Sequence, residues 1–197
     1  MQPELSILIP ALFERKSELI PTLAAQIGNL PVELLVLTDN RKRSTGLKRQ
    51  ALLDVAQGRY VTHLDDDDMV SGDYISEILA AIAMPEVDVI VFNQQSTWNG
   101  QNPFTVKCGL EFENEGVHKD AEDKLWQNIH RKPWHWCVWN SKIAKAAKFP
   151  DGYIDDDWFW LKQAIALAKT QHRIDKILHF YQHNSQTSAS QQGKPTT

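Results

Sequence analysis

Four consecutive aspartates, Asp65 to Asp68, are residues whose type and spacing could do chemistry. Two carboxylates about 5 Å apart repel each other by roughly 3 kcal/mol at an effective dielectric constant of about 20, so the run needs a bound cation, a proton or full solvation. In extended chain Asp65 and Asp67 point the same way and could share one divalent cation, leaving positions open for phosphate oxygens and water. A solvated acidic turn is the alternative interpretation. An EF-hand is excluded, because Val70 stands where that loop needs glycine and Ser76 where it needs glutamate.

A second acidic cluster, Asp155 to Asp157, introduces a helical segment further along the chain. Carboxylates at the start of a helix are stabilised by its dipole and by its free N–H groups, so helix capping is one interpretation. The other is general-base catalysis, in which a carboxylate accepts the proton of an attacking hydroxyl group at hydrogen-bond distance. The residues leave open which of the three aspartates would be the base.

A basic stretch follows the second expected strand and has five cations within nine residues: Arg41, Lys42, Arg43, Lys48 and Arg49. The expected sheet brings this stretch to the same edge as the aspartates, and a metal ion beside basic side chains is a common way to hold a diphosphate. A solvated loop is the alternative. Neither GxGxxG nor GxxxxGK(S/T) occurs, so the sequence supports neither a dinucleotide fingerprint nor a P-loop.

Short apolar runs alternate with amphipathic runs between residues 5 and 92. This pattern predicts an α/β fold with a Rossmann-like, mostly parallel central sheet flanked by helices. The expected strands are Leu5–Ile9, Val32–Leu37, Tyr60–Leu64 and Val87–Phe92. The expected helices are Glu18–Ile27, Leu47–Ala56 and Tyr74–Ala83, with Ser17 and Ser71 as N-caps and Gly58 as a stop. Because the aspartate run directly follows the third strand, it should lie at the edge of the sheet where ligands bind.

The second half of the chain has a less regular pattern. Residues 93–120 are expected to form a long excursion with one short strand near Phe104–Cys108. The elements expected after it are a strand Trp134–Trp139, helices Ser141–Lys148 and Asp156–Lys169, and a last strand Ile174–Tyr181. The polar tail 184–197 should be mobile.

Two kinds of aromatic side chain in this half could contribute to a site. Alternation along a strand would put Trp134 and Trp136 on one face, suited to core packing or to a platform under a sugar or base. His179, on the last expected strand, could supply a third ligand to a metal ion held mainly by carboxylates, or could be structural.

The composition of the 197 residues, with 23% charged residues and a net charge of −4, is that of a soluble globular protein with one domain. It disfavours disorder, collagen and coiled coil. The sequence has no run of about 18 apolar residues and no basic leader with a cleavage site, which predicts no membrane span and a cytoplasmic location. Cys108 and Cys137 form no CxxC pair, so neither a disulfide framework nor a structural zinc site is indicated.

With these features, the chain resembles the family 2 glycosyltransferases of the GT-A fold. The resemblance rests on the segments LSILIPALFER, VELLVLTDN, LKRQALLDVAQGRYVTHLDDDDMVSGDYI and FPDGYIDDDWFWLKQA. AQGRYVTHLDDDD is the specific part, since it is similar to the family's helix, glycine, strand and DxD motif in order and spacing. The resemblance implies a single GT-A domain over residues 1–183, with a nucleotide-sugar-binding half, 1–92, and an acceptor-side half, 93–183.

On the donor side, the resemblance implies roles for residues at the ends of the first two strands and in the basic stretch. The nucleotide's base and ribose would be bordered by Pro10, Ala11 and Asp39, and the base or diphosphate would be approached by Arg43, Lys48 or Arg49. The metal-binding DxD pair would be Asp65 and Asp67, with Asp67 as the main ligand and Asp66 facing the donor. Two departures bear on which base is bound: Leu12 and Phe13 replace the usual Tyr-Asn, and Thr38 replaces an aspartate.

On the acceptor side, Asp156 stands at the aspartate of the family's ED motif and would be the base, with Asp155 nearly as well placed. The resemblance thus implies a metal-dependent inverting glycosyltransferase that uses Mn²⁺ or Mg²⁺ and a nucleoside diphosphate sugar, with a UDP-sugar as the expected donor. Metal-dependent nucleotidyl transfer, which would release pyrophosphate, is a second hypothesis. A catalytically silent nucleotide or glycan binder is a third.

The resemblance implies that the acceptor is a hydroxyl group of a glycan precursor or of a hydroxymethylated base in DNA. The second possibility comes from similar small bacteriophage proteins, and it would place the protein in a host cytoplasm. A net charge of −4 offers no broad phosphate-binding surface, although Lys142, Lys145 and Lys148 could form a local stripe.

Overall fold

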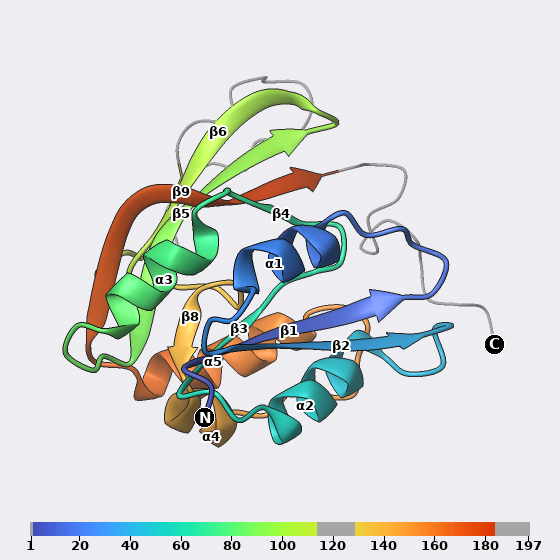
Figure 1. Cartoon of the computed structure of the whole chain (residues 1–197), viewed down its shortest axis with the longest axis horizontal. Coiled ribbons are helices and arrows are strands. Elements are labelled where there is room, and N and C mark those ends of the chain that lie inside the picture. Colours follow the sequence, from blue (N-terminus) through green and yellow to red (C-terminus); the bar gives the residue numbers. More distant parts are fainter. Residues whose placement is uncertain (1, 114–128, 184–197) are drawn as a thin grey trace.

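The alternating segments fold into one nine-stranded sheet with helices on both of its faces, as Figure 1 shows. The computed structural model describes residues 2–113 and 129–183. In these residues the strands are β1 (Leu5–Leu12), β2 (Val32–Asp39), β3 (Tyr60–His63), β4 (Met69–Val70), β5 (Val89–Trp98), β6 (Gln101–Cys108), β7 (Ile129–Arg131), β8 (Val138–Asn140) and β9 (Gln171–His183). The helices are α1 (Leu19–Ile27), α2 (Thr45–Val55), α3 (Tyr74–Ile82), α4 (Ser141–Ala146) and α5 (Asp156–Leu167).

The first half confirms the predicted Rossmann-like arrangement. β1 lies between β2 and β3, and both pairings are parallel. Leu5, Ile7, Leu8 and Ile9 of β1 are fully buried, as the apolar run predicted for a strand covered on both faces. In Figure 1, α1 and α3 cover one face of the sheet, while α2, α4 and α5 cover the other. The carboxyl ends of β1, β2 and β3 therefore meet at one edge.

The second half of the sheet is built around β5. The first residues of β5 pair with the antiparallel strand β8, and β8 in turn pairs with β3. The later residues of β5 pair with the antiparallel strand β6. On its other side β5 pairs with the parallel strand β9. The predicted short strand Phe104–Cys108 is confirmed as part of β6. The prediction of an irregular excursion was wrong for residues 93–103, because β5 continues to Trp98 and forms a hairpin with β6, with Asn99 and Gly100 in left-handed conformation at its tip. The further part of that excursion, 114–120, and the predicted tail, 184–197, lie outside the described residues.

A two-residue strand, β4, was not predicted and is important for the site. It follows the aspartate run directly and pairs with β9, so that Val70 lies opposite His179. This pairing brings the last strand beside the aspartate turn. No local sequence pattern could have predicted it, because the two strands are more than a hundred residues apart.

The tryptophan-rich segment does not form the predicted strand Trp134–Trp139. The chain turns there, with the Cys137 N–H donating to the Trp134 carbonyl at 3.0 Å, and only Val138–Asn140 is a strand. Trp136 is buried and stacks on His179, whereas Trp134 is partly exposed and stacks on Trp158. The prediction of a shared face for Trp134 and Trp136 was therefore wrong.

The predicted helix caps were also wrong in detail. The N-caps of α1 and α3 are Glu18 and Asp73, in place of Ser17 and Ser71. Ser44 caps α2 by accepting the Leu47 N–H. α2 ends at Val55, so Gly58 is not its stop. Gly58 is instead needed for packing, because a Cβ there would lie 2.5 Å from Ser6 Oγ, the atom that accepts the Gly58 N–H.

None of the helices in residues 2–113 and 129–183 has the length and apolar character needed to cross a membrane.

Candidate active site

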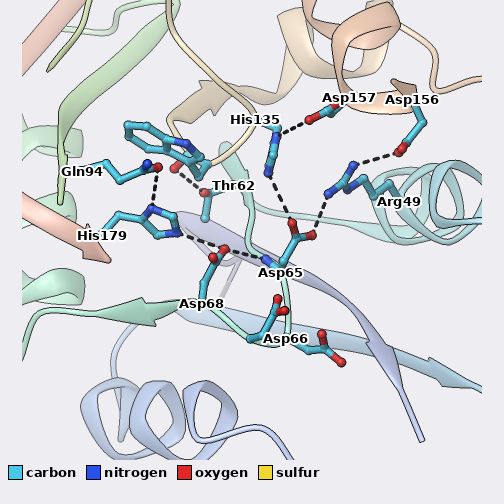
Figure 2. A network of polar contacts seen from close by, with 12 residues as sticks. Arg49, Thr62, Asp65, Asp66, Asp68, Gln94, His135, Asp156, Asp157 and His179 are labelled. Atoms are coloured by element: carbon cyan, nitrogen blue, oxygen red, sulfur yellow. Dashed lines mark hydrogen bonds and ion pairs between the residues drawn. The ribbon is translucent and has the colours of Figure 1, made fainter. Parts of the chain in front are cut away.

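The aspartate run forms a tight turn between β3 and β4, at the carboxyl edge of the parallel strands. Asp68 closes the turn: its backbone N–H donates to the Asp65 carbonyl at 3.0 Å, and its carboxylate accepts the Asp65 N–H at 2.9 Å. The same oxygen of Asp68, Oδ2, also lies 3.0 Å from His179 Nε2 (Figure 2). Asp68 is buried and is therefore a structural residue of the turn.

His179 was predicted as a third metal ligand, and the structure places it against Asp68 instead. Its Nδ1 is 3.1 Å from Gln94 Oε1, and its ring stacks on Trp136 at 5.1 Å between centres. Both ring nitrogens are thus engaged, and the side chain is 1% exposed. This geometry does not favour His179 as a metal ligand.

Arg49 connects the two acidic clusters. Its guanidinium donates to Asp65 at 2.6 Å and to Asp156 at 2.8 Å, so it lies between the aspartate turn and the start of α5 (Figure 2). Burial disfavours the charge of Arg49, but the two carboxylates outweigh it and raise the pKa of Arg49 above its ordinary value. Gly46, in the first turn of α2, allows this approach, because a Cβ there would lie 3.0 Å from the Cβ of Asp156.

The two carboxylates that share Arg49 differ in their pKa shifts. Asp156 is almost completely buried, and burial raises its pKa above the ordinary value despite Arg49. Burial also opposes ionisation of Asp65, but 36% of that side chain remains exposed, and Arg49 holds the pKa of Asp65 below its ordinary value. Asp156 therefore has the character of a buried structural partner of Arg49.

A second bridge between the clusters passes through His135. Its Nδ1 is 3.3 Å from Asp157 Oδ2 and its Nε2 is 4.0 Å from Asp65 Oδ2 (Figure 2). Burial opposes ionisation of Asp157, but its interaction with His135 holds the pKa of Asp157 well below the ordinary range. Asp157 keeps 24% of its side chain exposed, unlike Asp156. Asp157 is therefore an ionised carboxylate with access to solvent.

Asp155, the third member of this cluster, is exposed and has a left-handed backbone with φ of 60°. It is the N-cap residue of α5, but its side chain makes no capping hydrogen bond. The capping interpretation therefore does not hold for Asp155. Asp157 is nearer to a capping role, because its carboxylate accepts the N–H of Trp158 in the first turn of α5.

Asp66 and Asp67 share Arg15, a residue that sequence reasoning missed. Arg15 Nη1 lies 2.9 Å from Asp67 and also binds Asp66, whose second oxygen accepts the Leu12 N–H at 2.8 Å. Asp67 is 54% exposed, and its partial burial together with the charge of Asp65 raises its pKa to about 6. Asp67 is thus the carboxylate of the run whose charge is least compensated.

A cation beside Asp67 would favour its ionised form, which partial burial and the charge of Asp65 disfavour. The residues that would hold Mn²⁺ or Mg²⁺ are Asp67 and Asp65, which come from one turn and offer hard oxygen ligands. Within residues 2–113 and 129–183, no group of three histidine, cysteine or carboxylate side chains is arranged to hold a metal ion. Two carboxylates with phosphate and water as further ligands are compatible with Mg²⁺.

The remaining predicted residues lie at the ends of β1 and β2. Pro10 and Ala11 are buried in β1, and the Ala11 carbonyl accepts a hydrogen bond from the Lys48 ammonium at 2.9 Å. The same ammonium lies 3.3 Å from Asp39, which also accepts the backbone N–H groups of Arg41 and Arg43. Burial opposes ionisation of Asp39, but these hydrogen bonds hold its pKa below the ordinary value.

The structure therefore brings the predicted residues together in two groups. One group is the pair of acidic clusters joined by Arg49, and the other is the Asp39–Lys48 pair beneath the ends of β1 and β2. The side chain of Arg43 is exposed and belongs to neither group. Arg15 could have been found from its position just after the first strand, and His135 from its place between two tryptophans, but neither position alone indicates a bridge.

A family model described as glycosyl transferase family 2 matches residues 21–146, which is well over half of the chain. Among solved structures, Staphylococcus aureus TarS 1–349 in complex with UDP-GlcNAc is similar, with a TM-score of 0.65 and 15% identity, covering 95% of this chain and 60% of that one. Another crystal structure of TarS 1–349 is also similar, with a TM-score of 0.63 and 17% identity, covering 91% of this chain and 60% of that one.

Glucosyl-3-phosphoglycerate synthase from Mycobacterium tuberculosis, in complex with Mn²⁺, UDP and phosphoglyceric acid, has a TM-score of 0.54 and 10% identity, covering 90% of this chain and 70% of that one. The chain thus spans about 60% of the length of the TarS 1–349 structures that it matches. At these identities the likeness establishes the fold, which is the predicted GT-A fold. No curated protein sequence matches.

Proposed function

This chain belongs to glycosyltransferase family 2, and from that premise we propose that it transfers a sugar from a nucleoside diphosphate sugar to a hydroxyl group of an acceptor. The observation that carries the proposal is the connection of two acidic clusters through Arg49 and His135 at the carboxyl edge of the sheet. Such a site has a donor side, the aspartate turn, and an acceptor side, the start of α5.

The donor side would hold the nucleotide along the ends of β1 and β2. Asp39, fixed by Lys48, would border the ribose, with Ala11 and Pro10 beneath the base. Asp66 would lie beside this edge with its two oxygens held by Arg15 and the Leu12 N–H. Support for a UDP-sugar comes from the similar structures whose names include UDP-GlcNAc or UDP. Arg43 is exposed beside this edge and would approach the diphosphate.

Asp65 and Asp67 would hold Mn²⁺ or Mg²⁺ together with the donor. A bound divalent cation would neutralise negative charge on the departing diphosphate. Arg15, which contacts Asp67, lies beside the same place and would contribute positive charge to it. One of the similar structures contains Mn²⁺, which agrees with this assignment.

We assign the general base to Asp157 and not to the predicted Asp156. A base needs an oxygen that an acceptor hydroxyl can reach, and 24% of the Asp157 side chain is exposed, against 4% of the Asp156 side chain. Asp156 is buried with its carboxylate held by Arg49, and Asp155 is not fixed by any side-chain cap. His135 would position Asp157. Direct attack opposite the leaving group would invert the anomeric centre without a covalent intermediate.

The assignment is tested with Asp157→Asn, Asp156→Asn and Asp155→Asn, each measured for nucleoside diphosphate release, donor binding and stability. Asp157→Asn should lose at least a hundredfold in turnover, the usual contribution of a general base, while it binds the donor like wild type. Asp155→Asn is the matched control and should keep both. Release of pyrophosphate in place of nucleoside diphosphate would contradict sugar transfer. Turnover by Asp157→Asn within twofold of wild type would remove Asp157 as the base.

A further inference from the structure

Beside the proposed base lies a stack of three side chains from separate elements, Arg131, Trp134 and Trp158. The Arg131 guanidinium carbon is 3.4 Å from the centre of the Trp134 ring, and the rings of Trp134 and Trp158 are 6.0 Å apart with an angle of 25°. Trp134 is held in place because its carbonyl accepts the Cys137 N–H at 3.0 Å and the Trp139 indole N–H at 2.9 Å. The stack is therefore a fixed surface.

The charge of Arg131 is not compensated by the described part of the chain. Four other partly or fully buried arginines each pair with a carboxylate: Arg15, Arg49, Arg59 and Arg173. Within residues 2–113 and 129–183, no carboxylate lies within 4.0 Å of the Arg131 guanidinium. Burial accordingly lowers the pKa of Arg131, and the opposing effects of Cys108, Cys137 and the more distant Asp157 offset this only in part. A half-buried guanidinium in this state favours an anion, which it can bind through two N–H groups.

The stack adjoins the proposed base along the chain. Trp134 immediately precedes His135, whose Nδ1 is 3.3 Å from Asp157, and Trp158 immediately follows Asp157, so the surface would begin beside the acceptor hydroxyl. A second cation continues it: Lys162 Nζ lies 4.5 Å from the centre of the half-exposed Phe159 ring and 5.8 Å from that of Trp158. Aromatic faces of this kind suit a sugar or polyol chain, and the cations suit an anionic group attached to it.

We infer that this stack is an acceptor subsite for a small hydroxyl compound that carries one anionic oxygen group, phosphate or carboxylate, and that Arg131 binds this group. The inference rests on the proposed function, since it names the acceptor class of the same site. It favours a small anion over DNA as the acceptor. The lysines of the predicted stripe each contact another group and do not form a continuous phosphate-binding surface. Lys142 contacts Glu86, Lys145 contacts the Ala56 carbonyl, and Lys148 lies 3.7 Å from Asp54.

Direct binding to the full chain tests the inference. Arginine Nε–H and tryptophan indole N–H resonances of ¹⁵N-labelled protein are followed by NMR during titration with glycerol 1-phosphate, glycerate or uncharged glycerol. One or both anions should shift the Arg131 and Trp134 resonances, and glycerol should not. Arg131→Gln should weaken anion binding about tenfold, the effect of losing one charged hydrogen bond. Arg131→Lys should weaken it less, because the charge remains. Lys142→Gln is the control and should bind as wild type does.

Binding of a UDP-sugar to the same samples separates this inference from the proposed function. Equal anion binding by wild type and Arg131→Gln, with intact donor binding, would overturn the subsite and leave the glycosyltransferase proposal standing. Equal shifts by glycerol and by the anions would overturn it too, since charge would then be irrelevant. A short DNA duplex that binds at low salt in an Arg131-dependent way, while neither small anion binds, would overturn it in favour of nucleic acid. Absence of donor binding in every sample would contradict the proposed function itself.

Discussion

Replacement of Arg49 by methionine tests whether one buried cation holds the two acidic clusters together. Removing one partner of a buried ion pair costs about 3–5 kcal/mol, because the other charge remains buried without compensation. The pair with Asp156 belongs to this class, since 5% of the Arg49 side chain and 4% of the Asp156 side chain are exposed. The pair with Asp65 contributes less, because Asp65 is 36% exposed and solvent screens it. Arg49→Met should therefore lose about 3–5 kcal/mol of unfolding free energy.

The double variant Arg49→Met/Asp156→Leu is the matched control, because it removes the stranded charge as well. Apolar replacement of a whole buried pair is often neutral, so the double variant should lose no more than about 1 kcal/mol. Removal of Arg49 raises the pKa of Asp156 further. A carboxyl group with a raised folded pKa costs its full stability penalty above that pKa, and the penalty disappears only as the pH falls below the unfolded-state pKa, so the deficit of Arg49→Met should shrink between pH 7 and pH 4.

Urea unfolding followed by tryptophan fluorescence and circular dichroism measures these free energies, provided that the m-value is the same for all variants. A loss of less than about 1 kcal/mol in Arg49→Met would refute the reasoning. So would a double variant that is as unstable as the single one.

Three further substitutions probe the turn, the helix contact and the loop before β9. Asp67→Asn should abolish the thermal stabilisation by MnCl₂. Because the pKa of Asp67 is raised to about 6, the metal-free variant should be more stable than wild type at pH 7, but not below about pH 4. Gly46→Ala should lose about 1–3 kcal/mol in urea unfolding, since its Cβ would lie 2.0 Å from the Pro150 carbonyl oxygen. Asp88 accepts the Thr170 N–H at 2.9 Å, and such hydrogen bonds, against the effect of burial, lower its pKa. Asp88→Asn should therefore be less stable than wild type at pH 7. Urea unfolding curves should show this difference in stability disappearing as the pH falls below about 4.

The sequence predicted the strands and helices whose signal is local. β1 and β2 are apolar runs and were found with their starting residues. β5 was predicted to end at Phe92 but continues to Trp98, because Asn93, Gln94 and Ser96 are buried and paired on both sides although their side chains are polar. Only the partner strands β6 and β9 explain such residues, and β9 lies far along the chain.

The tryptophan segment shows the opposite error, a local signal that tertiary contacts override. Alternating Trp134 and Trp136 are typical of a strand, but a backbone hydrogen bond between Trp134 and Cys137 turns the chain. The turn places His135 between Asp65 and Asp157, which is the contact that distinguishes Asp157 from Asp156. A carboxylate at the start of α5 was therefore predictable as the proposed base, whereas the choice of Asp157 rests on its contact with a non-local histidine.

The charge of the aspartate run was the original reason to expect a metal ion, and the structure changes that reasoning. Asp65 pairs with Arg49, Asp66 with Arg15 and Asp68 with His179, so most of the repulsion is already compensated by the protein. What remains is Asp67, which shares Arg15 with Asp66, is the most exposed of the four and has a raised pKa. In the proposed function, the demand for a divalent cation would therefore come from Asp67 together with the donor's phosphates, and not from four unpaired carboxylates. For this reason a single substitution at Asp67 should separate metal binding from the folding of the turn.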